Sequence, residues 1–366
     1  MSDVELLCIG DSPDPSIYVR SDGVWREPPP LTPTSGVDSG RLRDRLDGVL
    51  KAVMNAGGGL PPEVKGLGFN LYESLVPDPI RRYLGRVADE AEQGNPPVLK
   101  VHVQRSYDWI PWELLYDGKD YLGLRFQIAR LPIVANPPDM SDRTKHPLRR
   151  VRSILGADVL PTPPDGEFDR WRKTFDGLLP PAAEELRVPP ADLADDAWPT
   201  MDIFKECQQD DILHFTCHGT VREGEPRWTL KQGDPQYWLY DITTTMLPTL
   251  NLSRARPLVF GNACRSGPSE AGLLPGLAIS LFGQGALNVI ATFAPISRTV
   301  AIEFARFFYE QLLGPNGASG LPVATALCAT KRHFAQSAAA DPSADPSYLF
   351  YCLYGPPDTR FVADVG

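Results

Sequence analysis

The sequence predicts a mixed α/β protein with a mostly parallel central sheet, preceded by an N-terminal region of strands and helices. From Val151 onward, short apolar segments alternate with segments of helical period, the pattern of a parallel sheet with crossover helices. Two of the apolar segments, within 210–219 and 258–267, run into turns that contain glycine. The chain has 366 residues, 42% of them hydrophobic, which is enough for a large buried core.

The N-terminal region is expected to span residues 1–94. Its apolar residues form two short strand-like runs and then recur at helical spacing, and a proline stands near the start of two of the helical segments. The predicted elements are strands at Val4–Ile9 and Ile17–Arg20 and helices at Asp38–Asn55, Pro62–Leu75 and Pro79–Glu92.

A second unit is expected to span residues 95–366. It opens with a strand at Pro97–Val103, followed by Trp109–Tyr116, whose large apolar side chains indicate core packing. Tyr121–Arg130 is predicted to return as another strand, and the proline-rich, charged segment Pro132–Pro147 to be a linker.

The rest of this unit carries the alternation of strands and helices. We expect strands at Val151–Gly156, within Asp210–Gly219, and at Pro257–Gly261, Ala286–Thr292 and Tyr348–Leu353, and helices at Glu167–Leu179, Thr200–Gln208, Thr243–Leu250, Gly272–Phe282, Arg298–Leu313 and Leu321–Gln336. Pro180–Pro199 is predicted to be irregular. Thr220–Asp241 is predicted to be a long loop with exposed aromatic side chains, which could cover the cleft and change on activation.

Composition limits the class of partner and the compartment. The formal net charge of −10 argues against direct nucleic-acid binding, because phosphates require a basic face. Residues 271–297 carry no charge, but prolines and glycines divide them into a helical and a strand-like half, which favours buried core over a membrane span. No secretory signal is recognisable at the N-terminus, and the six cysteines suit a reducing compartment. We therefore expect a cytoplasmic protein without membrane attachment, with free buried thiols at Cys8, Cys217, Cys328 and Cys352.

His218 and Cys264 are the candidate catalytic residues. Each is carried by an apolar strand, and chemistry in a parallel α/β sheet gathers at the carboxyl ends of the strands. A cysteine nucleophile requires a nearby base, which His218 would supply. The backbone amides of Gly219 and Cys264 could then stabilise an oxyanion, at about 3 kcal/mol per donor.

Other residues near this pair favour structural roles. His214 shares a strand face with Ile212 and Thr216, which indicates a structural histidine, and Cys217 would face the opposite side as a small core residue. A metal site made of Cys217, His218 and Cys264 would lack a fourth ligand, so no metal is expected.

Several motifs together resemble the CHAT family of caspase-like peptidases, relatives of separase. The motifs are Ile-Pro-Trp-Glu-Leu-Leu-Tyr at 110–116, His-Phe-Thr-Cys-His-Gly at 214–219 and Gly-Asn-Ala-Cys-Arg-Ser-Gly at 261–267, with further support from 276–286 and 348–356. The resemblance covers about 95–356 and implies a caspase-like three-layer α/β sandwich with His218 and Cys264 as its dyad. His218 and Cys264 are 46 residues apart in the sequence, which also fits caspases, where the histidine lies about 50 residues before the cysteine.

The resemblance implies a cysteine endopeptidase that needs no cofactor and cleaves one or a few partner proteins, in bacterial anti-phage defence or programmed cell death. Many relatives carry TPR repeats or sensor domains, and none is visible here, so a separate activator or sensor protein, or the N-terminal region, would control the enzyme. Two alternatives remain open: a catalytically silent interaction module, and a thiol hydrolase of small amides or esters.

Substrate preference is predicted less directly. Asp158 follows the strand Val151–Gly156 at the same sheet edge and could select a basic or polar side chain, or could simply cap a turn before Pro161. Glu270 is a second candidate for that pocket. Some basic-specific relatives have aspartate two residues before the cysteine, where this chain has Asn262, so the primary specificity stays open.

Overall fold

The structure is a computed structural model that describes most of the chain. The described residues are 3–9, 16–21, 24–26, 41, 44–46, 48, 62–91, 95–134, 145–156, 183–188, 207–222, 225–230, 241–265, 274–294, 296–314, 320–340 and 344–363. At residues 263–265, which include Cys264, the description is of the backbone.

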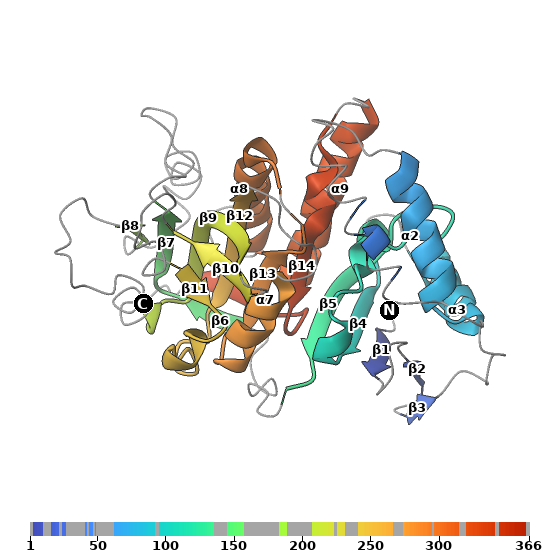
Figure 1. The fold of residues 1–366 in the computed structure, drawn as a ribbon, viewed down its shortest axis with the longest axis horizontal. Helices are drawn as coiled ribbons and strands as arrows, with labels where there is room; N and C mark the ends of the chain where they lie inside the picture. Colours follow the sequence, from blue (N-terminus) through green and yellow to red (C-terminus); the bar gives the residue numbers. More distant parts are fainter. Residues whose placement is uncertain are drawn as a thin grey trace.

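A single large sheet organises the described residues, with thirteen strands and the order β11-β10-β9-β12-β13-β14-β5-β4-β1-β2-β3; β7 and β8 add to it beside β9 (Figure 1). The strands are β1 Val4–Ile9, β2 Ser16–Ser21, β3 Val24–Arg26, β4 Val98–Val103, β5 Gln127–Pro132, β7 Val151–Gly156, β8 Ala183–Val188, β9 Ile212–Arg222, β10 Glu225–Thr229, β11 Asp241–Thr243, β12 Leu258–Arg265, β13 Asn288–Thr292 and β14 Tyr351–Tyr354. A separate two-stranded sheet pairs β6 Lys145–Leu148 with β15 Arg360–Ala363.

The sheet contains two blocks of parallel strands that run in opposite directions. β8, β7, β9, β12 and β13 form one block, and β14, β5, β4 and β1 form the other. The blocks meet where β13 pairs antiparallel with β14. Hairpin strands β10–β11 and β2–β3 extend the two ends.

Helices cover both faces and make a three-layer sandwich (Figure 1). The α-helices are α2 Pro62–Leu75, α3 Asp78–Glu90, α4 Leu122–Arg125, α7 Leu274–Gly283, α8 Arg298–Leu313 and α9 Val323–Ala340, with 3₁₀ turns η1 Arg105–Tyr107, η2 Trp112–Leu114, η5 Leu247–Thr249 and η7 Pro346–Phe350. α8 packs against α9 and β12, while α7 packs on β13 and β10. Ser297 caps α8, its Oγ accepting from the Val300 amide at 3.3 Å.

The mixed α/β class with a mostly parallel sheet is confirmed, and several elements match their predicted bounds. Val4–Ile9, Pro62–Leu75, Val151–Gly156 and Arg298–Leu313 are found as predicted. The uncharged segment 271–297 does divide into a helix, α7, and a buried strand, β13. Among the helices that the structure describes, none is long and apolar enough to cross a membrane.

Five predictions of local structure are wrong. Ala183–Val188, expected within an irregular connection, is the edge strand β8. Tyr121–Arg130 is not one strand, because 122–125 form a helical turn before β5. Part of the predicted loop Thr220–Asp241 belongs to the sheet as the end of β9 and as β10. In Thr243–Leu250 and at the start of Tyr348–Leu353, single 3₁₀ turns replace the expected helix and strand.

Other predicted elements fall largely on residues that are not described. Within Asp38–Asn55 the described residues 41, 44–46 and 48 are helical. Glu167–Leu179 lies outside the described residues, as does most of Thr200–Gln208.

Candidate active site

His218 and Cys264 occupy paired positions on adjacent parallel strands. The register of β9 with β12 places Cys264 directly opposite His218, one step beyond the pair Thr216–Asn262 on the same face. Neighbouring strands of a sheet lie about 4.8 Å apart, so the two backbones are within side-chain reach of each other. The His218 side chain is half-buried.

The parallel strands on either side of β9 and β12 end just before the position of His218 and Cys264. β7 pairs with β9 only as far as Thr216, and from His218 onward β10 takes its place beside β9. On the other side, continuing the register of β12 with β13 brings the last residue of β13, Thr292, level with Asn262. His218 and Cys264 therefore lie at the carboxyl edge of the parallel block, where such sheets place ligands and chemistry.

The expectation that the first strand breaks into a turn at His218 and Gly219 is wrong, whereas the turn expected at Ser266–Gly267 lies outside the described residues. β9 continues to Arg222 and β12 to Arg265. Gly219 is not in a turn but lies between two strands, opposite Arg265 of β12 and Trp228 of β10.

The Trp228 side chain of the hairpin strand β10 reaches across β9 to one face of β12. Trp228 is buried and its ring lies 5.2 Å from that of Phe215. A Cβ at Gly261 would fall 2.6 Å from Cη2 of that indole, so a side chain at position 261 has no room. The aromatic residue predicted to be exposed on a loop thus belongs to the core beneath the cysteine strand.

Polar side chains lie beneath His218 on the α8 face of β9. His214 is fully buried, with Nδ1 3.0 Å from the Tyr309 hydroxyl and Nε2 3.1 Å from Oγ1 of Thr216. Its ring stacks on Phe260 at 5.0 Å. The structural role predicted for His214 is confirmed, and Cys217, on the alternate face, is buried as expected.

Asn262 continues this polar layer on β12. Its Oδ1 accepts a hydrogen bond of 2.7 Å from the Tyr351 hydroxyl, and its Nδ2 donates one of 3.0 Å to the Ala301 carbonyl of α8. All three residues are fully buried. An Asn262 held in this way is part of the core.

The remaining predicted site residues fall outside what is described. Asp158 and Glu270 both lie outside the described residues, as does the side chain of Cys264. Cys8, Cys328 and Cys352 are buried and free as predicted, and Cys207 is buried as well. Within the described residues, no group of histidine, cysteine and carboxylate side chains has the arrangement of a metal site.

A buried charge cluster beneath Trp109–Tyr116 was not predicted. The core packing predicted there is confirmed, since Trp112, Ile110 and Leu115 are fully buried. Arg130 of β5 donates to Glu113 at 2.5 Å and to the Asp108 carbonyl at 2.8 Å.

Tyr354 of β14 completes the cluster by donating to Asp108 at 2.9 Å. Burial raises the pKa of Asp108 and outweighs the opposing pull of Arg130. Burial alone would lower the pKa of Arg130, but Glu113 and the other anionic groups raise it well above its usual value. Only the charge of Glu113 inside an apolar motif could have indicated this cluster from the sequence.

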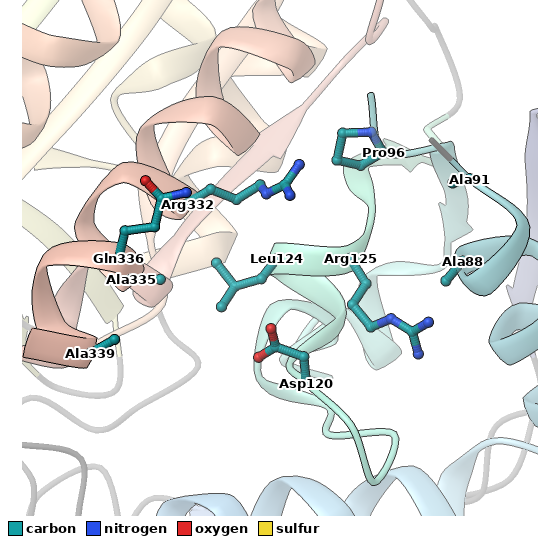
Figure 2. A pocket seen from close by; sticks show the side chains of 10 residues that line it. All are labelled: Ala88, Ala91, Pro96, Asp120, Leu124, Arg125, Arg332, Ala335, Gln336 and Ala339. Atoms are coloured by element: carbon teal, nitrogen blue, oxygen red, sulfur yellow. The ribbon is translucent and has the colours of Figure 1, made fainter. Parts of the chain in front are cut away.

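A pocket of about 410 Å³ lies between α3, α4 and α9, on the β4–β5 side of the sheet (Figure 2). Arg332, Gln336 and Asp120 point into it over a lining of alanines. Burial raises the pKa of Asp120. The residues that line this pocket all lie outside the block that carries His218 and Cys264.

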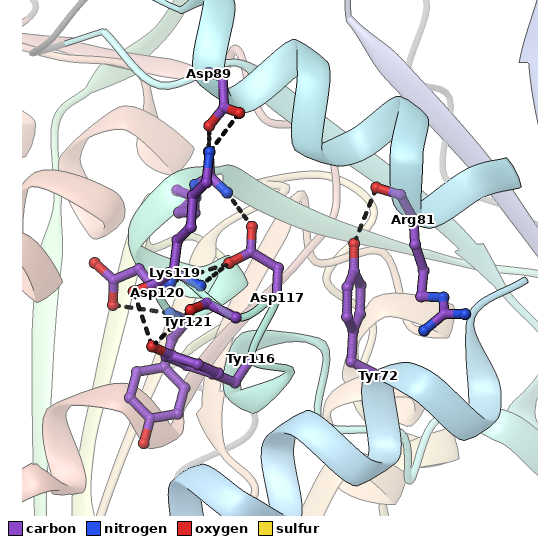
Figure 3. A network of polar contacts seen from close by, with 10 residues as sticks. Tyr72, Arg81, Asp89, Tyr116, Asp117, Lys119, Asp120 and Tyr121 are labelled. Atoms are coloured by element: carbon purple, nitrogen blue, oxygen red, sulfur yellow. Dashed lines mark hydrogen bonds and ion pairs between the residues drawn. The ribbon is translucent and has the colours of Figure 1, made fainter. Parts of the chain in front are cut away.

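An ion-pair network borders this pocket (Figure 3). Arg125 pairs with both Asp89 and Asp117, and Lys119 donates to Asp89 at 2.6 Å. Tyr72 donates to the Arg81 carbonyl at 3.3 Å. These contacts join α2 and α3 to the turn before α4.

Together, the three-layer sandwich, the mostly parallel sheet and a histidine beside a cysteine at its edge define the class of caspase-like α/β proteins. The CHAT domain profile matches residues 65–352. The chain therefore belongs to the CHAT family.

Solved structures similar to the chain have low sequence identity. The Arg-specific cysteine proteinase gingipain R is 12% identical with a TM-score of 0.47, covering 88% of this chain and 75% of its own. A chain of the Saccharomyces cerevisiae separase–securin complex is 14% identical with a TM-score of 0.43; the match covers 88% of this chain but 23% of that one. A third structure, described as a protease, is 14% identical with a TM-score of 0.41, covering 78% and 69%. No curated protein sequence matches the chain.

Proposed function

We propose that this protein is a cysteine endopeptidase in which Cys264 is the nucleophile and His218 its base. The observation that carries the proposal is the register of β9 with β12, in which the two residues are opposite each other. Membership of the CHAT family supports the same reaction class. The alternation of a strand puts position 264 on the same side as position 262, and position 218 on the same side as position 216, so both positions belong to the face of the sheet on which Asn262 bonds to α8.

The proposed reaction is acyl transfer in two steps. His218 takes the proton of the Cys264 thiol, and the sulfur attacks the carbonyl carbon of the scissile peptide. The tetrahedral intermediate collapses as the imidazolium returns the proton to the leaving amine, which leaves a thioester. A water molecule, deprotonated by the same imidazole, hydrolyses the thioester and frees Cys264.

The amides of Gly219 and Cys264 are the proposed donors to the oxyanion. Both residues lie at the level of the dyad, and each donor would contribute about 3 kcal/mol. Gly219 lies between β10 and β12. To bind the oxyanion, its N–H group must therefore not be donated to a carbonyl of either strand.

The substrate is proposed to be a partner protein, with a separate protein as activator or sensor. These features come from the family resemblance, as does a role in bacterial anti-phage defence or programmed cell death. Asp158 and Glu270 remain the proposed contacts for the residue before the scissile bond. A cytoplasmic location, and the boundary at residues 94–95 between an N-terminal region and the peptidase domain, also remain proposals.

A covalent peptide probe of mixed sequence tests the proposed function directly. A set of peptidyl acyloxymethyl ketones with varied side chains is incubated with the purified protein and, separately, with a lysate of cells that express it. The labelled residue is identified by mass spectrometry. We expect a label on Cys264 that is absent in Cys264→Ala and strongly reduced in His218→Ala. A folded protein that takes no label in either setting would indicate a silent interaction module instead.

A further inference from the structure

We propose that Asn262 is a positioning residue for Cys264. Its carboxamide ties β12 to α8 and to β14 by hydrogen bonds, and so sets the position at which the strand presents the nucleophile two residues later. The inference rests on the proposed function of Cys264, and its test reports on the two separately.

The carboxamide of Asn262 joins three elements through two different kinds of hydrogen bond. Its oxygen accepts from Tyr351 of β14 at 2.7 Å, and its nitrogen donates to the carbonyl of Ala301 in α8 at 3.0 Å. An amide is suited to this place because it offers an acceptor and a donor at once, whereas an ionised carboxylate would only accept. The helical carbonyl of Ala301 has a second lone pair for the added bond.

The surroundings of these bonds are dry and rigid. Asn262, Tyr351 and Ala301 are 0% exposed. The ring of Tyr351 stacks on Phe304 of α8 at 3.8 Å with an interplanar angle of 3°, which holds its hydroxyl in place. Buried hydrogen bonds of this kind are costly to leave unmade, so they fix geometry more firmly than the same bonds in water.

The histidine strand is fixed to the same helix in a comparable way. Thr216 lies opposite Asn262 in the register and contacts Nε2 of His214, whose Nδ1 contacts Tyr309 of α8. Both strands are thus tied to α8 just below the level of His218 and Cys264. Loss of the Asn262 tether would let β12 shift relative to β9 and so separate thiol from imidazole.

This burial also excludes Asn262 as a contact for substrate side chains. A residue with 0% exposure and both ends of its carboxamide bonded inside the core offers no atom to a pocket. Some basic-specific relatives have aspartate at the position of Asn262. In this chain, Asn262 instead holds β12 in place.

Two tyrosines of β14 form a matched pair for the test. Tyr351 and Tyr354 are both fully buried, and each donates its hydroxyl to a buried side chain, Asn262 or Asp108. Of the two hydroxyls, that of Tyr351 is the one bonded to the cysteine strand. Tyr351→Phe and Tyr354→Phe are compared with the native chain by thermal unfolding and by the rate at which iodoacetamide alkylates Cys264, followed by peptide mass spectrometry across pH 5–9.

We expect both variants to unfold at lower temperature, but only Tyr351→Phe to alkylate Cys264 more slowly, by about tenfold, because small misplacements of reacting groups carry large rate costs. In assays with a peptide that the native enzyme cleaves, Tyr351→Phe should lower kcat and leave KM unchanged. In a double-mutant cycle, Tyr351→Phe should add nothing to the rate loss of Asn262→Ala.

The possible outcomes separate the two proposals. If native Cys264 alkylates no faster than the buried cysteines, the proposed nucleophile is wrong and the positioning role fails with it. If native Cys264 is reactive but both tyrosine variants react at the native rate, or both are slowed alike, Asn262 has no positioning role while the dyad stands.

Discussion

The indole of Trp228 lies against the backbone of Gly261, where an added Cβ would be 2.6 Å from Cη2 of the ring. Trp228 is on the hairpin strand β10 and Gly261 is three residues before Cys264 on β12. The Trp228 ring is therefore in close contact with the cysteine strand, although β9 lies between the two strands in the sheet. A change at either residue is transmitted directly to the strand that carries the proposed nucleophile.

Gly261→Ala should destabilise the protein by about 1–3 kcal/mol, the usual cost of forcing an extra methyl group into a packed core. Urea unfolding followed by tryptophan fluorescence measures the change. Gly66→Ala is the control, because nothing lies within 4 Å of a Cβ at that exposed helical position. There the substitution should be neutral or stabilising by up to about 1 kcal/mol. Equal effects at the two glycines would contradict the close packing of Trp228 on β12.

Arg130→Leu should cost about 3–5 kcal/mol, because it leaves Glu113 and Asp108 buried without their cation. Arg306→Leu is the matched control. Arg306 also pairs with two carboxylates, Glu303 and Glu310, but these pairs are on the surface of α8 and should contribute less than about 1 kcal/mol. The free energy of unfolding in urea distinguishes the two variants. A loss at Arg130 no larger than that at Arg306 would show that the cluster is not needed for stability.

Stability should fall as the pH rises above 9, in part through Cys8. Burial, assisted by Asp108, raises the pKa of Cys8 from 9.0 to about 12. The unfolded chain thus releases this proton at lower pH than the folded chain does. The stability linked to Cys8 is complete below pH 9 and is lost as the pH rises toward 12, by up to about 1.4 kcal/mol per pH unit.

Cys8→Ala should therefore flatten the decline of unfolding free energy between pH 9 and pH 11, even though it lowers stability at pH 7 by leaving a small cavity. Denaturant midpoints measured at intervals of 0.5 pH unit provide the slopes. A variant whose slope equals that of the native chain would show that Cys8 ionises equally well in the folded protein.

The elements that could be predicted from the sequence are those whose local pattern of apolar and polar residues is sufficient to determine their structure. Arg298–Leu313 has a helical period and a capping serine before it, and Val151–Gly156 is a short apolar run that ends at glycine, so both were found with their bounds. The pairing of His218 with Cys264 followed from the rule that parallel strands present their carboxyl ends together.

The features that were missed depend on contacts between distant parts of the chain. Ala183–Val188 carries three charged residues, and only its pairing with β7 makes it a strand. The turn at 122–125 forms where Gly123 packs closely on Glu113, a contact that no local pattern reveals. The cluster around Arg130 draws residues from η2, β5 and β14, and Trp228 looked exposed because charged residues surround it in the sequence.

The most direct test of the proposed dyad is the pH dependence of Cys264 alkylation in the native chain and in His218→Gln. The buried thiols give a clear background, because burial raises the pKa of Cys352 to about 12 and of Cys328 to about 11, and they should stay unreactive near neutral pH. If His218 is the base, Cys264 should alkylate rapidly with an apparent pKa below the ordinary thiol value of about 8.5, and His218→Gln should move that pKa up to or above this value. An unchanged profile in His218→Gln, with the fold intact, would contradict the pairing of these two residues as a catalytic dyad.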